Sequence, residues 1–172
     1  QHNGAGRSAR RRDRVGGTVA RATQPCTGDR GRGSQGRAGR YRPQEVGEEV
    51  GRAAAAGAWI VQIHARTRDG GPEWRVETFA EIFAEVRARA DVIVNFSTGA
   101  IGVPREDRIQ HVTELRPEMA ALNMGSMNYA IYSAKRKTFL HDHVFANPFK
   151  DIQFFLEAMN KAGVRPEMEC FD

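Results

Sequence analysis

The chain has 172 residues, a length typical of one domain, and combines 40% hydrophobic with 27% charged residues. It contains no run of 18 apolar residues and no apolar segment of the signal-peptide type near its start, which argues against a membrane span and a secretory leader. Its two cysteines, Cys26 and Cys170, lack the spacing of a metal site or a CxxC pair. We therefore expect a soluble protein in a reducing, cytoplasmic setting.

The net charge of +5 is unevenly distributed along the chain. Residues 1–42 hold 11 Arg, no Lys and two acids, which gives +9 and leaves −4 for the other 130 residues. This segment also holds nine of the 18 glycines and no Leu, Ile, Phe or Met, so it has little apolar surface to offset the entropy of folding. We predict that residues 1–42 are disordered and that residues 43–172 form the domain.

Three interpretations of the Arg-rich segment remain open. Clustered arginines are typical of an arm that binds nucleic acid through phosphate contacts. An unstructured tail has the same composition, and so does GC-rich coding DNA read in the wrong frame or joined wrongly in a gene model. No aromatic residue precedes Tyr41, so the stacking surface of a single-strand binder is missing.

From residue 43 onward, the patterns predict alternating helices and strands. Pro43 suits a first helical turn, and Thr78 with Glu81 forms an S/T-x-x-E capping box before an apolar helical face. Asn147 is the expected cap of the last helix, and the segment between 123 and 147 is predicted to be a polar loop. The predicted helices cover 43–56, a segment from 78 onward, 106–114 and 148–162, and the predicted strands cover 58–64, 91–96, 119–123 and 164–171.

This alternation is typical of an α/β fold with parallel strands joined by helical crossovers. A doubly wound sheet and a (β/α)8 barrel both fit it. No G-x-G-x-x-G lies between a strand and a helix to favour a dinucleotide-binding fold. A complete barrel needs roughly 200 residues or more, so in the second case the chain holds about half of one.

Polar residues stand at each predicted strand end, which is where a barrel carries its active site. Alternation along a strand places Gln62 and His64 on one face, and Glu167 and Glu169 likewise on one face. The candidates are Gln62, His64, Ser97, Thr98, Gly99, Asn123, Ser126, Glu167 and Glu169.

Each of these residues has two readings. The His64 imidazole suits a zinc ion that polarises a carbonyl, or it is a hydrogen-bonded structural histidine. Ser97 and Thr98 beside Gly99 suit a bound carboxylate or phosphate, or an ordinary turn. Glu169 suits a metal ligand, a base or an ammonium-binding carboxylate.

Other polar residues are weaker candidates. The His-Asp-His run at 141–143 is a rival metal site, but it has no third ligand near it in the sequence. Arg66, Arg68 and Asp69 are interpreted as loop charges.

Five longer motifs follow one another at fitting distances between residues 43 and 172. They are AAGAWIVQIHARTRDG, VIVNFSTGAIG, LRPEMAALNMGSMN, DHVFANPFKDI and GVRPEMECFD. Together they resemble the β-keto acid cleavage enzymes, the family that includes the 3-keto-5-aminohexanoate cleavage enzyme of lysine degradation. The resemblance implies a TIM barrel, commonly a homotetramer, of which this chain would hold about strands 2 to 5 with their helices.

The resemblance also implies a reaction and roles for particular residues. The family transfers acyl groups with a zinc ion, converting a β-keto acid and acetyl-CoA to acetoacetate and a new acyl-CoA. His64 resembles the second histidine of the family's H-x-H zinc pair, Ser97 a serine that holds the keto acid, and Glu169 the acidic residue at the substrate end of the pocket. Asn123 and Ser126 fall in a segment that lines the pocket in relatives, and Thr98 and Gly99 adjoin Ser97.

This chain departs from the family pattern at three places. Gln62 stands where the first zinc histidine is expected, the Arg-rich segment stands where the first barrel strand is expected, and the R-V-G-L-E-D motif would lie beyond Asp172. We therefore expect an inactive fragment of a β-keto acid cleavage enzyme. The alternative is a non-catalytic binding module whose basic arm contacts nucleic acid.

Overall fold

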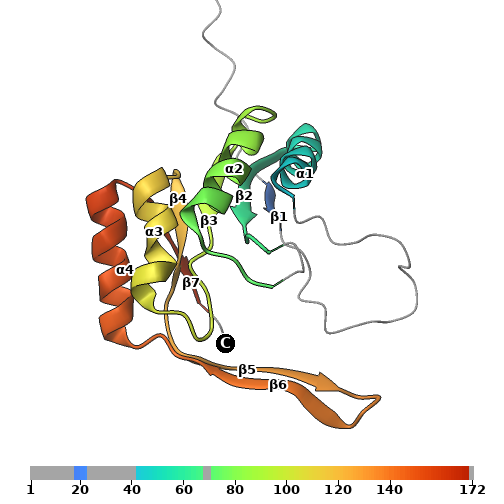
Figure 1. Cartoon of the computed structure of the whole chain (residues 1–172), viewed down its shortest axis with the longest axis vertical. Helices are drawn as coiled ribbons and strands as arrows, with labels where there is room; N and C mark the ends of the chain where they lie inside the picture. The colour runs from blue at the N-terminus through green and yellow to red at the C-terminus, as the bar shows by residue number, and fades with distance from the viewer. Residues whose placement is uncertain (1–17, 23–41, 68–70, 171–172) are drawn as a thin grey trace, which may run out of the picture.

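The computed structural model describes residues 18–22, 42–67 and 71–170. A five-stranded parallel sheet forms one layer and four helices form the other, while a two-stranded antiparallel hairpin extends away from them (Figure 1). The strands are β1 (Thr18–Ala22), β2 (Ala58–Ile63), β3 (Ile93–Phe96), β4 (Met119–Asn123), β5 (Met127–Ser133), β6 (Thr138–Phe145) and β7 (Arg165–Glu169), and the helices are α1 (Pro43–Ala55), α2 (Val76–Arg87), α3 (Arg105–Leu115) and α4 (Phe149–Ala162).

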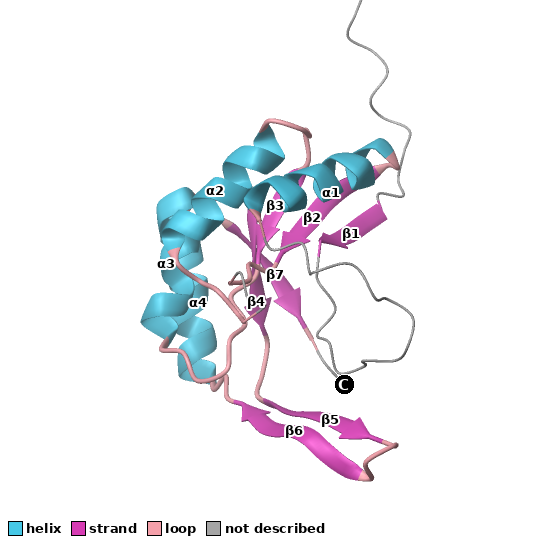
Figure 2. Ribbon diagram, turned by 45° about the vertical axis from the view of Figure 1, so that its right-hand side comes forward, coloured by secondary structure: helices cyan, strands magenta, loops and turns pink. Residues whose placement is uncertain are grey.

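The order of the sheet strands follows the order of the chain, β1-β2-β3-β4-β7. The four helices lie along one face of the sheet, and none of the described helices lies on its other face (Figure 2). A doubly wound sheet reverses its strand order and carries helices on both faces, so this arrangement excludes that alternative for the described residues. The predicted α/β class with parallel strands is confirmed. The described strands form an open arc rather than a closed barrel.

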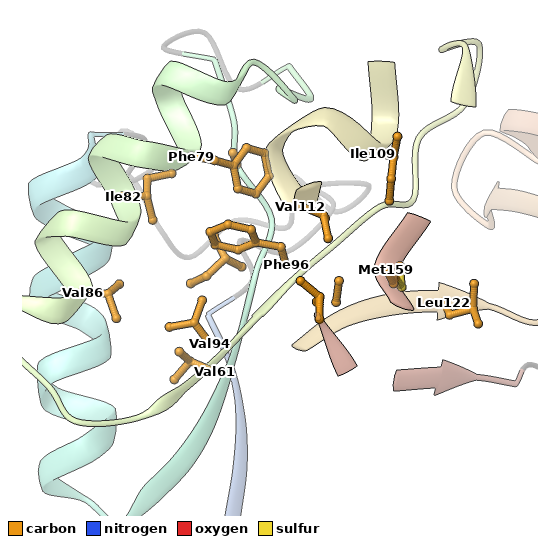
Figure 3. Close-up of a cluster of buried hydrophobic side chains, with 14 of the residues drawn as sticks. Val61, Phe79, Ile82, Val86, Val94, Phe96, Ile109, Val112, Leu122 and Met159 are labelled. Atoms are coloured by element: carbon orange, nitrogen blue, oxygen red, sulfur yellow. The ribbon is translucent and has the colours of Figure 1, made fainter. Parts of the chain in front are cut away.

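The apolar core lies between the sheet and the helices. Phe96 of β3 packs its ring edge-on against Phe79 of α2, with the ring centroids 4.9 Å apart. The apolar face predicted for the second helix is confirmed, because Phe79, Ile82 and Val86 are all buried (Figure 3). On the strands, Val61 and Val94 point into this core, so residues 62 and 95 point to the opposite face of the sheet.

The prediction that residues 1–42 are disordered is wrong for Thr18–Ala22. These residues form β1, which pairs in parallel with β2 and places Arg21 in register with Gln62. The Arg-rich segment therefore supplies a parallel strand at the edge of the sheet. A strand at the edge of a sheet can form through backbone hydrogen bonds alone, and β2 provides the partners. The low apolar content of residues 1–42 therefore gave no sign of this strand. The rest of the segment lies outside the described residues.

The predicted polar loop between 123 and 147 is also wrong. Most of it forms the hairpin β5–β6, in which Tyr132 and Phe139 pack ring against ring with centroids 5.2 Å apart. Lys137 adopts φ +51° in the turn between the strands. Alternation of apolar and polar residues is weak here because both faces are largely exposed, so the strand signal is weak as well.

Two predicted helix caps are wrong, because neither helix has a side-chain cap hydrogen bond. Helix α2 begins at Val76 rather than behind Thr78, and the Glu73 carboxylate accepts the backbone N–H groups of Trp74 and Arg75, just before the helix, each at 3.0 Å. Helix α4 begins after Pro148. Asn147 instead donates its side-chain amide to the carbonyl oxygen of Asn123 at 2.6 Å.

None of the helices in the described part of the chain combines the length and apolar character needed to cross a bilayer.

Candidate active site

The polar residues predicted at the strand ends gather at one edge of the sheet, because parallel strands all end on the same side. Gln62 of β2 is in register with Asn95 of β3, and Asn123 of β4 is in register with Glu169 of β7. Gln62 and Asn95 are 2% and 1% exposed. These side chains lie on the face that the helices leave uncovered.

Gln62 and Glu169 meet across this face although they are 107 positions apart in the chain. The Gln62 amide Nε2 donates a hydrogen bond of 2.7 Å to the Glu169 carboxylate Oε1. Three strand spacings separate β2 from β7, which is about 14 Å in a flat sheet. The hydrogen bond therefore requires the sheet to curve toward this face, as an arc of a barrel does.

A second contact of the same kind lies two residues earlier along β7. Asn95 of β3 donates its side-chain amide to the carboxylate of Glu167 on β7. Glu167 and Glu169 thus point to the same face, which confirms the alternation predicted for this strand. The intervening Met168 points to the other face, where it is 68% exposed. The uncovered face therefore carries amide and carboxylate pairs at the ends of these strands.

The loop after β3 places a hydroxyl and a backbone amide beside β4. Ser97 Oγ accepts the Gly99 N–H at 3.3 Å, and Thr98 Oγ1 donates to the Ala121 carbonyl at 2.7 Å. A methyl group built on Gly99 would lie 3.6 Å from Asn123 Nδ2 and 3.8 Å from Ser97 Oγ. The structure therefore brings Ser97, Gly99 and Asn123 around one small space.

His64 and the loop after β3 share a pocket at the same edge. The pocket is lined by the loops that follow β2 and β3, and by Phe79 of α2 and Arg108 and His111 of α3. Arg75 binds Glu73 through a 2.6 Å ion pair, and this side-chain contact holds the pKa of Glu73 below its ordinary value. Arg68 and Asp69 lie outside the described residues.

The family model for beta-keto acid cleavage enzyme matches residues 25–172. The chain belongs to the β-keto acid cleavage enzyme family. This family match begins within the Arg-rich segment, before the boundary at residue 43.

The similar proteins include a transferase that is named for acetyl-CoA and an enzyme that is named for the cleavage of a keto acid. A 3,5-dioxohexanoate:acetyl-CoA acetone transferase of Paraburkholderia graminis is 34% identical and aligns with 76% of this chain and 47% of its own length. A 3-keto-5-aminohexanoate cleavage enzyme of Fusobacterium nucleatum is 36% identical over 77% of this chain and 45% of its own. The chain thus spans about half the length of these relatives.

A solved structure supports the fold alone. The apo structure of ObcA superposes with a TM-score of 0.60 and 20% identity, covering 76% of this chain and 30% of ObcA. The alternative of a nucleic-acid-binding module gains no support from these relatives. It rests on residues 1–42, of which the structure describes only 18–22 and Arg42.

The described residues of this family member do not fit a zinc centre. His64 offers one imidazole, and the neighbouring Gln62 offers an amide that is bound to Glu169. No group of three His, Cys, Asp or Glu side chains suited to a metal occurs within the described ranges. An amide is a poorer zinc ligand than imidazole, so Gln62 and His64 together form a weak zinc pair.

Two further candidates lie elsewhere. His141 and His143 are on β6 of the hairpin, with ring centroids 6.0 Å apart, and take no part in the strand-end cluster. Ser126 Oγ accepts the backbone N–H of Asn147 at 2.8 Å, so it ties the base of the hairpin to the start of α4.

Sequence reasoning missed two buried polar residues of α3 that hold the loop after β3. Arg108 Nε donates to the Thr98 carbonyl at 2.8 Å, and His111 Nε2 lies 3.0 Å from the Ser97 carbonyl. They are 4% and 1% exposed. Arg108 and His111 are three residues apart, so they lie on one side of α3. Each adjoins a buried apolar residue, Ile109 or Val112, and this pattern was the one sign in the sequence that both face the sheet.

The burial of His111 predicts a pH-dependent stability. Burial lowers the pKa of His111 from 6.5 to about 4, with the hydrogen bond to Ser97 opposing this shift. Between pH 6.5 and 4, His111 therefore binds a proton in the unfolded chain but not in the folded chain. The free energy of unfolding falls as the pH falls through this range. We expect urea unfolding at pH 5 to show about 2 kcal/mol less stability than at pH 7.5 from this residue.

Two histidine variants check the source of this slope. His111→Phe should be much less sensitive to pH between 7.5 and 5, while His143→Gln, on the exposed hairpin, should keep the wild-type slope. Equal slopes in all three proteins would contradict the assignment to His111.

Proposed function

We propose that the strand-end cluster binds a β-keto acid, as part of a site that exchanges acyl groups with acetyl-CoA. In this reaction the acyl group of the keto acid moves to the CoA sulfur, and the acetyl group joins the remaining CH2–COO⁻ unit to form acetoacetate. The observation that carries the proposal is the convergence of Ser97, Gly99 and Asn123 at one strand edge of a chain that belongs to this family.

The chemistry of these groups suits the proposed substrate. The Ser97 hydroxyl and the Asn123 amide are hydrogen-bond donors, and a keto acid presents carboxylate and enolate oxygens that accept such bonds. The Gly99 N–H donates to Ser97 Oγ and so orients that hydroxyl. In this proposal, Glu169, paired with Gln62, forms the acidic wall of the site. An acidic wall favours substrates that carry a positive or hydrogen-bond-donating group at the end away from the carboxylate.

Zinc dependence, a tetrameric assembly and a place in lysine degradation are properties that the family resemblance suggests. Gln62 weakens the case for zinc in this chain, and the donors of the proposed site act without a metal in binding the substrate anion. Acetyl-CoA as co-substrate is supported by the relatives whose names include acetyl-CoA.

A glycine substitution tests the proposed binding space. Gly99→Ala places a methyl group at ordinary contact distance from Ser97 Oγ and Asn123 Nδ2, so the protein should fold normally and bind acetoacetate about tenfold more weakly. NMR titration of the 172-residue chain with acetoacetate measures this effect, and 3-hydroxybutyrate, which lacks the keto group, serves as the control ligand.

The matched control is Gly125→Ala, whose new methyl group meets nothing within 4 Å and should leave binding unchanged. Failure of the wild-type chain to bind acetoacetate in preference to 3-hydroxybutyrate would overturn the proposed function.

A further inference from the structure

One helix binds two consecutive carbonyl oxygens of the loop after β3. The His111 ring lies against the Ser97 carbonyl and the Arg108 guanidinium against the Thr98 carbonyl, both in buried surroundings. A carbonyl oxygen only accepts hydrogen bonds, so His111 Nε2 must carry the proton and donate it. His111 Nδ1 has no hydrogen-bond partner, which agrees with a neutral ring protonated at Nε2 alone.

Both side chains are held rigidly where they make these contacts. The His111 ring stacks on Phe79 with a centroid distance of 3.9 Å and an interplanar angle of 16°. The Arg108 guanidinium lies 4.7 Å from the centroid of the Phe155 ring of α4. The two donors are therefore fixed by packing before any ligand arrives.

The direction of these carbonyls determines the direction of the amides that follow them. In a trans peptide the C=O and the next N–H point in opposite directions, and the described residues contain no cis peptide. Because the Ser97 and Thr98 carbonyls point toward α3, the N–H groups of Thr98 and Gly99 point away from it. Ser97 Oγ lies on that far side, since it accepts the Gly99 N–H.

We propose that Arg108 and His111 are positioning residues that turn the Thr98 amide and, through the Gly99 amide that binds Ser97 Oγ, the Ser97 hydroxyl toward a bound oxyanion. This inference rests on the proposed function, in which the keto acid lies beside Ser97, Gly99 and Asn123. Both side chains line the pocket, but Arg108 Nε and His111 Nε2 are bound to the Thr98 and Ser97 carbonyls, so in this proposal they act through the loop backbone. An oriented backbone N–H and a hydroxyl held by a second backbone N–H form the kind of concave surface that binds carboxylate or enolate oxygens.

Two substitutions at His111 separate positioning from packing. His111→Phe keeps the ring stacked on Phe79 and loses the donor, whereas His111→Gln keeps a donor at a similar distance and loses the ring. We expect His111→Phe to be the more stable variant in urea and to move the Thr98 and Gly99 amide resonances strongly, with acetoacetate binding about tenfold weaker. His111→Gln should be less stable, with amide resonances and binding near those of the wild type.

Arg108→Lys and Arg108→Met repeat the comparison at the Thr98 carbonyl, with lysine as the variant that keeps a donor. The inference is wrong if, at both positions, the size of the amide shifts in the variants follows their loss of stability and not the loss of the hydrogen-bond donor. Arg108 and His111 would then contribute packing alone. The amide readout needs no ligand. Amide shifts that follow the donor in a chain that fails to bind acetoacetate would support positioning and overturn the proposed function, whereas acetoacetate binding without this pattern would overturn positioning alone.

Discussion

Gln62→His is expected to raise the affinity of this chain for Zn²⁺ at least about tenfold, which corresponds to ~1.4 kcal/mol. The wild-type chain should bind zinc weakly, because His64 is its one imidazole at the strand end and the Gln62 amide is engaged with Glu169 at 2.7 Å. A histidine at position 62 lies on the same strand face as His64, two residues away, and supplies a second imidazole. Competition with a chromophoric chelator, after removal of bound metal, measures both affinities.

Two controls locate the gain in zinc affinity. Adding His64→Ala to Gln62→His should remove it, and adding His141→Asn, on the hairpin, should leave it unchanged. Stoichiometric tight zinc in the chelator-washed wild-type protein would contradict the view that Gln62 weakens this site.

Gly47→Ala is expected to destabilise the protein by about 2–3 kcal/mol, the upper range for overpacking. Helices α1 and α2 approach so closely at this point that a methyl group on Gly47 would lie 2.9 Å from both the Cβ and the backbone oxygen of Glu85. A backbone oxygen cannot rotate away as a side chain can, so the two helices would have to separate. Chemical unfolding followed by circular dichroism measures the change.

Gly51, one turn further along α1, provides the matched control. A methyl group there would lie 3.6 Å from Arg89 Cβ, an ordinary contact. Gly51→Ala should therefore stabilise the protein by about 0.5–1 kcal/mol, because alanine favours a helix over glycine. Equal stabilities of the two variants would show that α1 and α2 do not meet as closely as the structure indicates.

The helices and strands after residue 43 were largely predictable because their signals lie within a few residues of one another. The strand at 119–123 has the predicted bounds, and α3 differs from its prediction by one residue at each end. The apolar spacing of Phe79, Ile82 and Val86 marked the buried face of α2 correctly. Such patterns depend on the helical and strand periods alone.

The caps, the hairpin and β1 were not predictable in the same way. Asn147 has the side chain of a cap, but the Asn123 carbonyl, 24 positions earlier in the chain, takes its amide. β1 consists of residues in an Arg-rich segment, and its pairing with β2 is visible in the fold alone. For Asn147 and β1 the deciding partner is distant in the sequence, so local propensity is overridden by tertiary contacts.

The sequence by itself determined the family, the parallel α/β elements and the residue types at the strand ends, since these depend on motifs and local periodicity. The tertiary structure alone decided which of those residues meet. Curvature of the sheet brings Gln62 to Glu169, and the packing of α3 turns Arg108 and His111 onto the loop that carries Ser97. These contacts join residues that are 10 to 107 positions apart, so they form only when the sheet and the helices pack together.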